Sequence, residues 1–200
     1  MGRVPTIEVE TAGGTREVSL DALHLKNRNI FITGEINQES ANDFLSRFLY
    51  LTQESNEPIT VYINSPGGEV LSGLLIYDAI VGSNVEVNTV CAGLAASMAA
   101  IILSAGTIKH RFILEHSKVM IHEPLIAGGA GGSATSIKTL SDHLLETKRV
   151  TNEALAKRTG KSQEEIDEAT KEDNYMSAKE AVKFGLCDYV TRSINIVRGA

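Results

Sequence analysis

Apolar residues in the first half of the chain follow two alternating spacings, one typical of strands and one typical of helices. Residues 29–34 form a short run rich in β-branched side chains between polar and glycine residues, which predicts a buried strand. From 41 to 52 the apolar residues recur at intervals of three and four, which predicts an amphipathic helix. A second strand at 59–63 and a second helix at 70–79 repeat this order.

Glycine-containing segments are expected to separate these strands from the helices that follow them. The sequence Asn-Ser-Pro-Gly-Gly at 64–68 predicts a turn between the second strand and its helix. A third strand is predicted at 85–92, with Gly93 interrupting it. A helix of small residues then starts near Ser97 and ends by Gly106. The unit of strand, turn and helix is therefore repeated.

The second half of the chain contains one long predicted helix. A short strand at 119–122 leads into residues 127–132, where glycine and alanine either let the chain flex or let another backbone approach closely. The helix spans 135–158 and stops before Gly160. Its apolar residues spread beyond one narrow stripe, which predicts two buried faces. Capping-box spacings mark the starts of two further short helices, at Ser162 with Glu165 and at Ser177 with Glu180.

The alternation of strands and helices predicts an α/β fold with parallel strands, right-handed crossovers and layered helices. Two hundred residues suit one compact domain, and no solenoid repeat or linker divides the chain, so we expect a single domain over residues 1–200. Hydrophobic residues at 42% and charged residues at 22% are ordinary for a globular protein. The mean hydropathy of -0.03 argues against a membrane protein.

Charge and cysteine content exclude several classes of partner and location. A net charge of -6 without a Lys/Arg run disfavours nucleic acid. The most apolar stretch, 90–106, is shorter than the roughly 20 residues of a membrane-spanning helix. The N-terminus has no apolar signal-peptide centre, so we expect no export, no membrane partner and a cytoplasmic location. Cys91 and Cys187 lack metal-ligand spacing, which predicts reduced packing residues and no metal site.

Ser97 is the first candidate for chemistry, because it follows a strand and begins a helix among very small residues. Unpaired amides at a helix start stabilise an oxyanion, which makes the N–H of Met98 a candidate donor. A serine there can equally be an N-cap or a small packing residue. The Gly-x-Ser-x-Gly elbow of α/β-hydrolases is absent, since Ala95 and Ala99 occupy the glycine positions, so a different scaffold is required.

His122 and Asp173 are the candidates for a base and its partner. His122 follows the apolar strand at 119–121, and strand ends are common places for a general base. The alternative is a structural histidine that is hydrogen-bonded at a strand end. Asp173 precedes the second capping box in a predicted loop, where a solvated carboxylate is the simpler interpretation of the residue alone.

Several motifs together resemble those of Clp protease proteolytic subunits. They are Tyr-Ile-Asn-Ser-Pro-Gly-Gly at 62–68, the segment 93–100 around the serine, Val-Met-Ile-His with Pro-Leu at 119–125, Asp-Asn-Tyr-Met-Ser-Ala at 173–178, and Gly-Leu at 185–186. The resemblance covers the chain from about residue 4 to about 192. It implies a fold of repeated ββα units, shared with crotonases, from which a strand–helix handle protrudes.

The resemblance assigns roles to the candidate residues. It implies that Ser97 is the nucleophile, His122 the general base and Asp173 the acid that orients the imidazole. The amides of Gly68 and Met98 would form the oxyanion hole. The remaining implied positions are Gly67, Pro124 and Leu125 for substrate binding by an added strand, Tyr62 and Phe48 for docking of an unfoldase, and Lys171 and Glu172 for contacts between subunits. Core packing remains an open alternative for Phe48.

The resemblance also implies an assembly. Two heptameric rings would enclose a chamber in which unfolded polypeptides are hydrolysed, with residues 123–158 as the handle between rings and 16–122 and 159–200 as the head. Residues 1–15 would line an axial pore. An ATP-driven AAA+ unfoldase of the Clp type would deliver the substrates. Because the chain has no Walker A motif, ATP would be used by that partner and we expect no cofactor here.

The chain departs from the family pattern at two places. The glycine-rich segment at 126–133 lacks the usual glutamine and is about two residues longer. Lys171 and Glu172 stand where many members carry an Asp-Arg pair that forms ion pairs between rings, so the charges are exchanged. We expect this exchange to favour assembly with copies of the same chain over a paralogue of ordinary polarity.

Two other functions compete with proteolysis. A crotonase-type acyl-CoA enzyme has a similar fold and also uses paired backbone amides, but the set of Ser97, His122 and Asp173 argues against it. A catalytically silent ring subunit is the non-enzymatic alternative, and the same three residues disfavour it.

Overall fold

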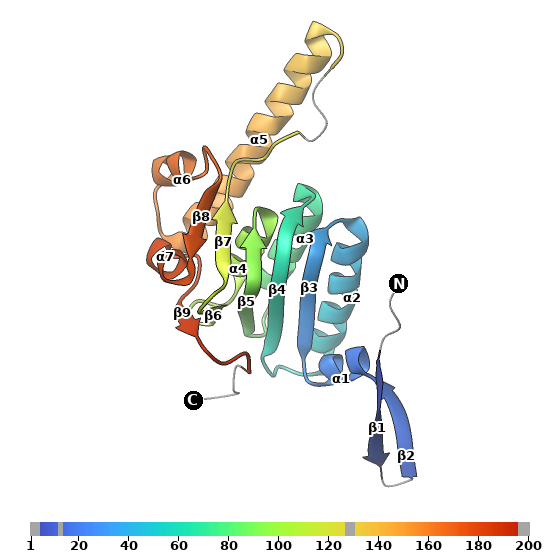
Figure 1. The fold of residues 1–200 in the computed structure, drawn as a ribbon. Coiled ribbons are helices and arrows are strands. Elements are labelled where there is room, and N and C mark those ends of the chain that lie inside the picture. The colour runs from blue at the N-terminus through green and yellow to red at the C-terminus, as the bar shows by residue number, and fades with distance from the viewer. Residues whose placement is uncertain (1–4, 12–13, 127–130, 196–200) are drawn as a thin grey trace.

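A computed structural model describes residues 5–11, 14–126 and 131–195, which form a mixed α/β fold (Figure 1). The strands are β1 (Thr6–Thr11), β2 (Gly14–Ser19), β3 (Asn29–Ile36), β4 (Ile59–Gly68), β5 (Val87–Ala96), β6 (Arg111–Leu114), β7 (Lys118–Ile121), β8 (Asn174–Ser177) and β9 (Tyr189–Thr191). The helices are α1 (Leu20–Lys26), α2 (Gln38–Glu54), α3 (Val70–Val81), α4 (Met98–Ala105), α5 (Ala134–Thr159), α6 (Gln163–Ala169) and α7 (Ala178–Phe184).

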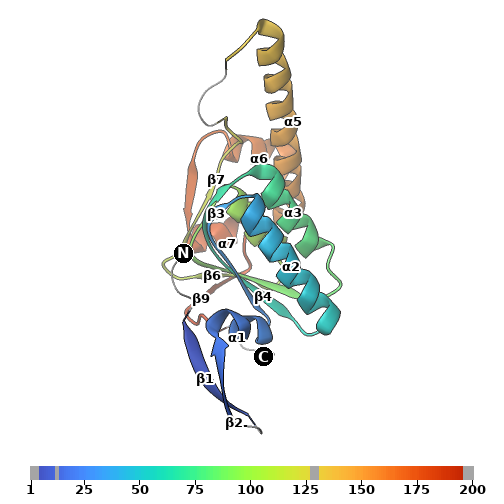
Figure 2. The same cartoon turned by 90° about the vertical axis from the view of Figure 1, so that its right-hand side faces the viewer.

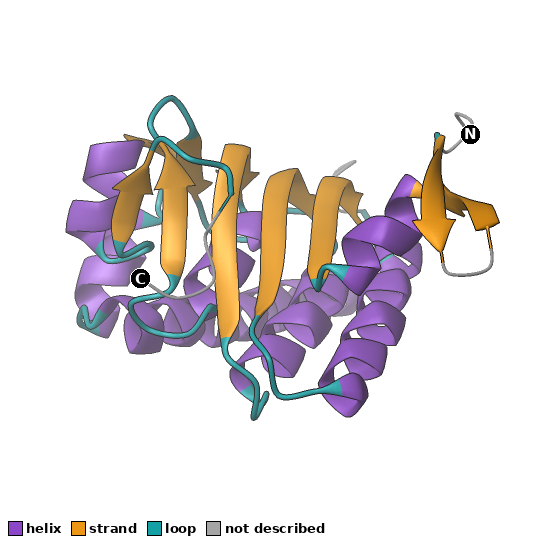
Figure 3. Ribbon diagram, turned by 90° about the horizontal axis from the view of Figure 1, so that it is seen from below, coloured by secondary structure: helices purple, strands orange, loops and turns teal. Residues whose placement is uncertain are grey.

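The main sheet has the strand order β3-β4-β5-β6-β9, and all these neighbours are parallel. This confirms the predicted parallel pairing. Helices α2, α3 and α4 lie along one face of the sheet, and the view from below in Figure 3 shows helices packed behind the strands. Strand β7 pairs in parallel with the end of β5, and β8 adds to β7 in the antiparallel direction. The short strands β6, β8 and β9 were not predicted.

The predicted glycine turns are instead continuations of strands, so that part of the prediction is wrong. Residues 64–68 remain in β4, with a register shift near Ser65 against both neighbouring strands. Strand β5 likewise runs through Gly93, which has a φ of 119°. Before Gly93 the strand pairs with β6, and after it with β7. Glycine here lets a strand shift register and change partner without ending.

The core lies between the sheet and its helices. Alternate residues of β3 and β4 point inward against the apolar stripe of α2, which includes Phe44 and Phe48. Helix α4 is buried over its whole length, as its small side chains predict. Both capping boxes predicted at Ser162 and Ser177 are present. The two cysteines are free and buried, as expected.

Two elements extend from the body at opposite ends (Figures 1 and 2). Helix α5 projects at the end toward which β3, β4 and β5 run, and Gly160 ends it in the left-handed conformation, as predicted. The β1–β2 hairpin projects at the other end, beyond α1. The predicted axial segment, residues 1–15, contains β1 and only the first two residues of β2, so the hairpin crosses the predicted boundary with the head. Residues 1–4, 12–13, 127–130 and 196–200 lie outside the described residues. No helix in the described ranges is long and apolar enough to cross a membrane.

Candidate active site

Ser97 lies at the junction of β5 and α4 in a backbone conformation that is rare for a residue with a side chain. Its φ is 55° and its ψ is -123°. The N–H of Ser97 donates to the carbonyl of Met120 on β7 at 2.8 Å. Residues held in such sparsely populated conformations cluster at functional sites. The amide of Met98, in the first turn of α4, is among the N–H groups that a helix start leaves without an intrahelical acceptor.

The glycines of β4 approach this junction so closely that no side chain fits. A Cβ atom added to Gly67 would lie 2.8 Å from the Cβ of Ser97 and 3.1 Å from the amide nitrogen of Met98. One added to Gly68 would lie 2.1 Å from the carbonyl oxygen of Ile36, and both glycines have positive φ, at 92° and 149°. The strand that carries the predicted oxyanion donor Gly68 therefore lies directly beside Ser97 and Met98.

The three candidate side chains form one hydrogen-bonded series. Nε2 of His122 lies 2.9 Å from Oγ of Ser97, and Nδ1 lies 3.0 Å from Oδ1 of Asp173. The His122 side chain is 17% exposed and that of Asp173 58% exposed. This order lets the imidazole accept a proton from the hydroxyl while the carboxylate holds its tautomer. The sequence separated these residues by 25 and 51 positions, and the fold brings them together.

The segments that carry His122 and Asp173 are joined to each other. Strands β7 and β8 pair just before His122 and just after Asp173, with Ile121 opposite Asn174. The N–H of Glu123 donates to the carbonyl of Thr170 at 2.6 Å. Backbone pairing on both sides thus fixes the distance between the imidazole and the carboxylate.

Side chains of helix α5 bind the segments that carry His122 and Asp173, a contribution that the sequence analysis missed. Nδ2 of the buried Asn152 donates to Oγ1 of Thr170 at 3.1 Å and to Oδ1 of Asp167 at 2.7 Å. Nζ of Lys148 pairs with the carboxylate of Glu123 at 2.5 Å. The signal that the sequence offered for Asn152 is an amide side chain close to apolar residues near the end of the predicted helix. Its partners are not apparent from the sequence.

Cysteine chemistry does not compete with Ser97. Burial raises the pKa of the Cys91 thiol to about 12, and burial also raises the pKa of Cys187. Both thiols are therefore protonated at neutral pH and are poor nucleophiles. In the described ranges, His, Cys, Asp and Glu side chains form no group of three or more that would hold a metal ion.

The other predicted site residues take different positions. Pro124 and Leu125 follow His122 after Glu123, and Leu125 is 65% exposed. Gly67 is buried against Ser97. Lys171 and Glu172 are exposed, and Lys171 pairs with Glu168 at 3.6 Å within the same chain.

The two predicted docking residues differ. Tyr62 stacks on the half-exposed ring of Phe31 at 5.2 Å, on the face of β3 and β4 opposite the core, and donates a hydrogen bond to the carbonyl of Ile194. Phe48 is only 3% exposed and stacks on Phe44 at 5.3 Å. Phe48 is thus a core residue that cannot form part of a surface pocket, because the i,i+4 stripe of α2 turns it toward the sheet.

A hydroxyl, an imidazole and a carboxylate linked in this order, beside amides at the start of a helix, define a site of the serine hydrolase class. The family model for Clp protease matches residues 12–193 of the chain. The chain is also 41% identical over 194 residues to the ATP-dependent Clp protease proteolytic subunit of Ligilactobacillus salivarius (strain UCC118), a match that covers 96% of this chain and 98% of the relative. The chain therefore belongs to the Clp protease family.

Proposed function

We propose that this chain is a serine endopeptidase subunit that hydrolyses unfolded polypeptides with Ser97, His122 and Asp173 as its catalytic triad. The observation that carries the proposal is the unbroken series of hydrogen bonds from the Ser97 hydroxyl through His122 to Asp173. Membership of the Clp protease family supports the reaction class. The complete series disfavours both a silent ring subunit and a crotonase-type enzyme, because neither needs these three side chains in contact.

In the first half of the reaction, Nε2 of His122 takes the hydroxyl proton of Ser97 as Oγ attacks a peptide carbonyl. The amides of Gly68 and Met98 would donate to the resulting oxyanion, where removing one such donor typically costs about 3 kcal/mol in the barrier. The carboxylate of Asp173 stabilises the imidazolium through Nδ1. The imidazolium then gives its proton to the leaving amine, the C–N bond breaks, and an acyl ester of Ser97 remains.

In the second half, His122 removes a proton from water as the water oxygen attacks the acyl ester. Collapse of the second tetrahedral intermediate breaks the ester bond and returns the proton to Oγ of Ser97, which restores the enzyme and releases a carboxylic acid. An extended substrate lying beside Gly67, Pro124 and Leu125 would bind through backbone hydrogen bonds, which tolerate many sequences. These two steps need no cofactor.

The experiment compares the wild-type protein with Ser97→Ala, using a fluorogenic peptide and a fluorophosphonate probe. We expect turnover and labelling by the wild type and neither by Ser97→Ala. Ser46→Ala is the matched control, because Ser46 is an exposed serine on α2, remote in the fold from the β5–α4 junction, and it should keep both signals. Equal turnover by wild type and Ser97→Ala would overturn the proposal, and a folded wild type that the probe leaves unlabelled would do so as well.

The proposed assembly consists of two heptameric rings that enclose the active sites, joined through α5 and the exposed Lys171 and Glu172, with residues 1–15 at the axial entrance. The Ligilactobacillus salivarius relative is an ATP-dependent Clp protease proteolytic subunit, which supports an AAA+ unfoldase as the partner that consumes ATP. Tyr62 and Phe31, on the open face of the sheet, are the proposed docking residues. Native mass spectrometry of the chain with a paralogue of ordinary Asp-Arg polarity tests the exchanged charges, and freely mixed rings would refute that part.

A further inference from the structure

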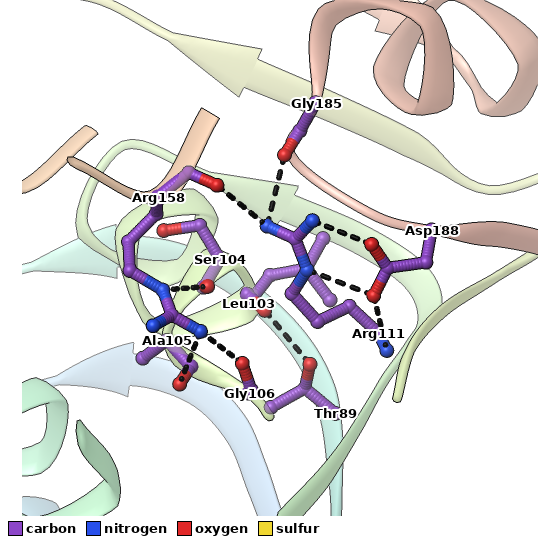
Figure 4. Close-up of polar contacts among 9 residues, drawn as sticks. All are labelled: Thr89, Leu103, Ser104, Ala105, Gly106, Arg111, Arg158, Gly185 and Asp188. Carbon is purple, nitrogen blue, oxygen red and sulfur yellow. Dashed lines mark hydrogen bonds and ion pairs between the residues drawn. The ribbon is translucent and has the colours of Figure 1, made fainter. Parts of the chain in front are cut away.

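The two ends of α4 differ in what surrounds their backbone amide and carbonyl groups. At its start the amide of Met98 faces the site beside Ser97. At its other end, the last carbonyl groups all accept hydrogen bonds from side chains outside the helix (Figure 4). The hydroxyl of Thr89 on β5 donates to the carbonyl of Leu103 at 2.7 Å. The remaining three carbonyls, of Ser104, Ala105 and Gly106, are bound by one residue, Arg158.

Arg158 reaches these carbonyls from the last turn of α5. Its Nε donates to the carbonyl of Ser104 at 2.8 Å, and its Nη2 donates to that of Ala105 at 3.2 Å and also to Gly106. Among the described residues Arg158 forms no ion pair with a carboxylate. Within the described ranges, the hydrogen bonds of its side chain all go to the end of α4, where a cation also opposes the negative end of the helix dipole.

The backbone of Arg158 is fixed as firmly as its side chain. Its carbonyl accepts a hydrogen bond at 3.0 Å from Nη1 of Arg111, which is 4% exposed. The same Nη1 donates to the carbonyl of Gly185 at 2.9 Å, while Nε and Nη2 of Arg111 hold the two oxygens of Asp188 at 2.9 and 2.6 Å. Figure 4 shows the two guanidinium groups side by side, one binding Asp188 and the other the end of α4.

Burial of Arg158 lowers the pKa of its guanidinium, and the nearby Tyr77 opposes that shift. The group stays charged at neutral pH, since an arginine pKa begins above about 12. The carbonyl dipoles offset the cost of removing the half-buried guanidinium from water. Truncating the Arg158 side chain would leave these carbonyls without their donors and would remove the contact between α4 and the base of α5.

We propose that Arg158 is a positioning residue that fixes α4 to the base of α5, so that the placement of Ser97 and the Met98 amide relative to His122 depends on how α5 is seated. Helix α4 has eight residues and is therefore about 12 Å long, which makes it a short rigid lever between Arg158 and Ser97. The strained backbone of Ser97 persists only while its surroundings hold it. This inference rests on the proposed peptidase function.

The test compares Arg158→Gln and Arg158→Lys with Thr89→Val. The valine removes the hydroxyl partner of the Leu103 carbonyl at the same end of α4, and in the described part of the chain Thr89 forms no hydrogen bond with α5. For each protein, kcat and KM for a fluorogenic peptide, the rate of fluorophosphonate labelling, Tm and oligomeric state are measured at a temperature where all are folded. Native mass spectrometry confirms that the compared samples have the same assembly.

We expect Arg158→Gln to lower kcat and the labelling rate together, by about tenfold to a hundredfold, with KM nearly unchanged, because a displacement of about 1 Å at a reacting atom is worth up to that much. The kcat and labelling rate of Arg158→Lys should lie between those of Arg158→Gln and the wild type. Lysine keeps the positive charge but lacks the planar set of N–H donors of the guanidinium. Thr89→Val should stay within about twofold of the wild type whatever its loss of Tm.

Two results would overturn the inference. One is an Arg158→Gln protein that is folded and labels within twofold of the wild type. The other is a Thr89→Val protein that loses kcat as steeply as Arg158→Gln, which would mean that fraying of α4 alone causes the loss. If Arg158→Gln does not fold, unchanged kcat in Arg158→Lys overturns it instead. An unlabelled wild type would refute the peptidase proposal itself, so the two failures are distinguishable.

Discussion

The two halves of helix α5 differ in what surrounds them, although they form one continuous helix (Figure 1). The distal half, residues 134–147, is largely exposed and includes Ile137 at 45% and Leu145 at 62% exposure. The basal half, residues 148–159, contains all the buried residues of the helix and its contacts with the site segments. The basal half therefore belongs to the active-site scaffold, while the distal half presents apolar surface that a second copy would cover in the proposed assembly.

Among the substitutions that test the two halves of α5, the largest loss of stability is expected at Asn152, which is buried in the basal half. In Asn152→Leu, the hydroxyl of Thr170 and the carboxylate of Asp167 both lose a donor. Thr170 keeps its bond to the Ile166 carbonyl, and Asp167 keeps its bond from Gln163, so the cost is that of two lost hydrogen bonds. At about 0.5–1.5 kcal/mol for each bond, thermal unfolding should show a loss of Tm of about 2–12 °C. Peptide turnover should fall as well, because Asn152 holds Thr170 in place. The carbonyl of Thr170 accepts a hydrogen bond from Glu123, next to His122, and so sets the distance between His122 and the segment of Asp173.

The matched control for Asn152→Leu is Ser141→Leu, on the exposed distal half of the same helix. It should leave Tm and turnover unchanged in samples of equal assembly. The comparison between the halves would be broken if Asn152→Leu kept the wild-type Tm, or if Ser141→Leu lost as much.

The local pattern was sufficient for the longer helices and the central strands, but not for the N-terminal elements β1, β2 and α1 or for the contacts at the base of α5. Periodicity predicted α2, α3, α4 and α5 because each carries a long regular stripe or a clear stop such as Gly160. It missed β6, β8 and β9, which have three or four residues and no period to detect. It treated Gly93 as an interruption because glycine usually punctuates a strand, whereas here it marks a change of partner.

The site itself was predictable in part. Ser97 stood out locally through its place before a helix of small residues, whereas His122 and Asp173 needed family motifs to be joined to it. Asn152 and Arg158 were not found, because their partners lie 15–18 and 52–54 positions away and depend on how loops meet. Residue type alone does not say that the Asn152 amide will meet side chains at the end of α6, or that the Arg158 guanidinium will meet carbonyls at the end of α4.

A second, smaller effect concerns the ion pair that anchors the base of α5 through Arg111. Burial alone would raise the pKa of Asp188, but its hydrogen bonds and attraction to Arg111 outweigh this and hold the pKa below its ordinary range. Asp188 thus contributes stability at neutral pH that is lost as the pH falls through its folded pKa, below about 4. Asp188→Asn should lower Tm at pH 7, and the difference from the wild type should shrink toward pH 3.

The control for this pH dependence is Asp142→Asn, which removes an exposed ion pair with Lys138 in the distal half. Such pairs contribute about 0–1 kcal/mol, so its Tm should follow that of the wild type at every pH. A difference between Asp188→Asn and the wild type that stayed constant from pH 7 to pH 3 would show that the carboxylate charge is not what anchors the base.

The smallest effect on folding is expected at Leu145, in the distal half of α5. This residue gives the clearest contrast between the two halves of the helix. Because the side chain is already 62% exposed, Leu145→Ser should change the free energy of unfolding of the isolated chain by less than about 0.5 kcal/mol. Sedimentation velocity should nevertheless show smaller assemblies, since the substitution removes apolar area that the second ring would bury. Lys157→Ser, on the exposed side of the basal half, should leave assembly unchanged. If Leu145→Ser assembled as the wild type does, the distal half would need another explanation for its apolar surface.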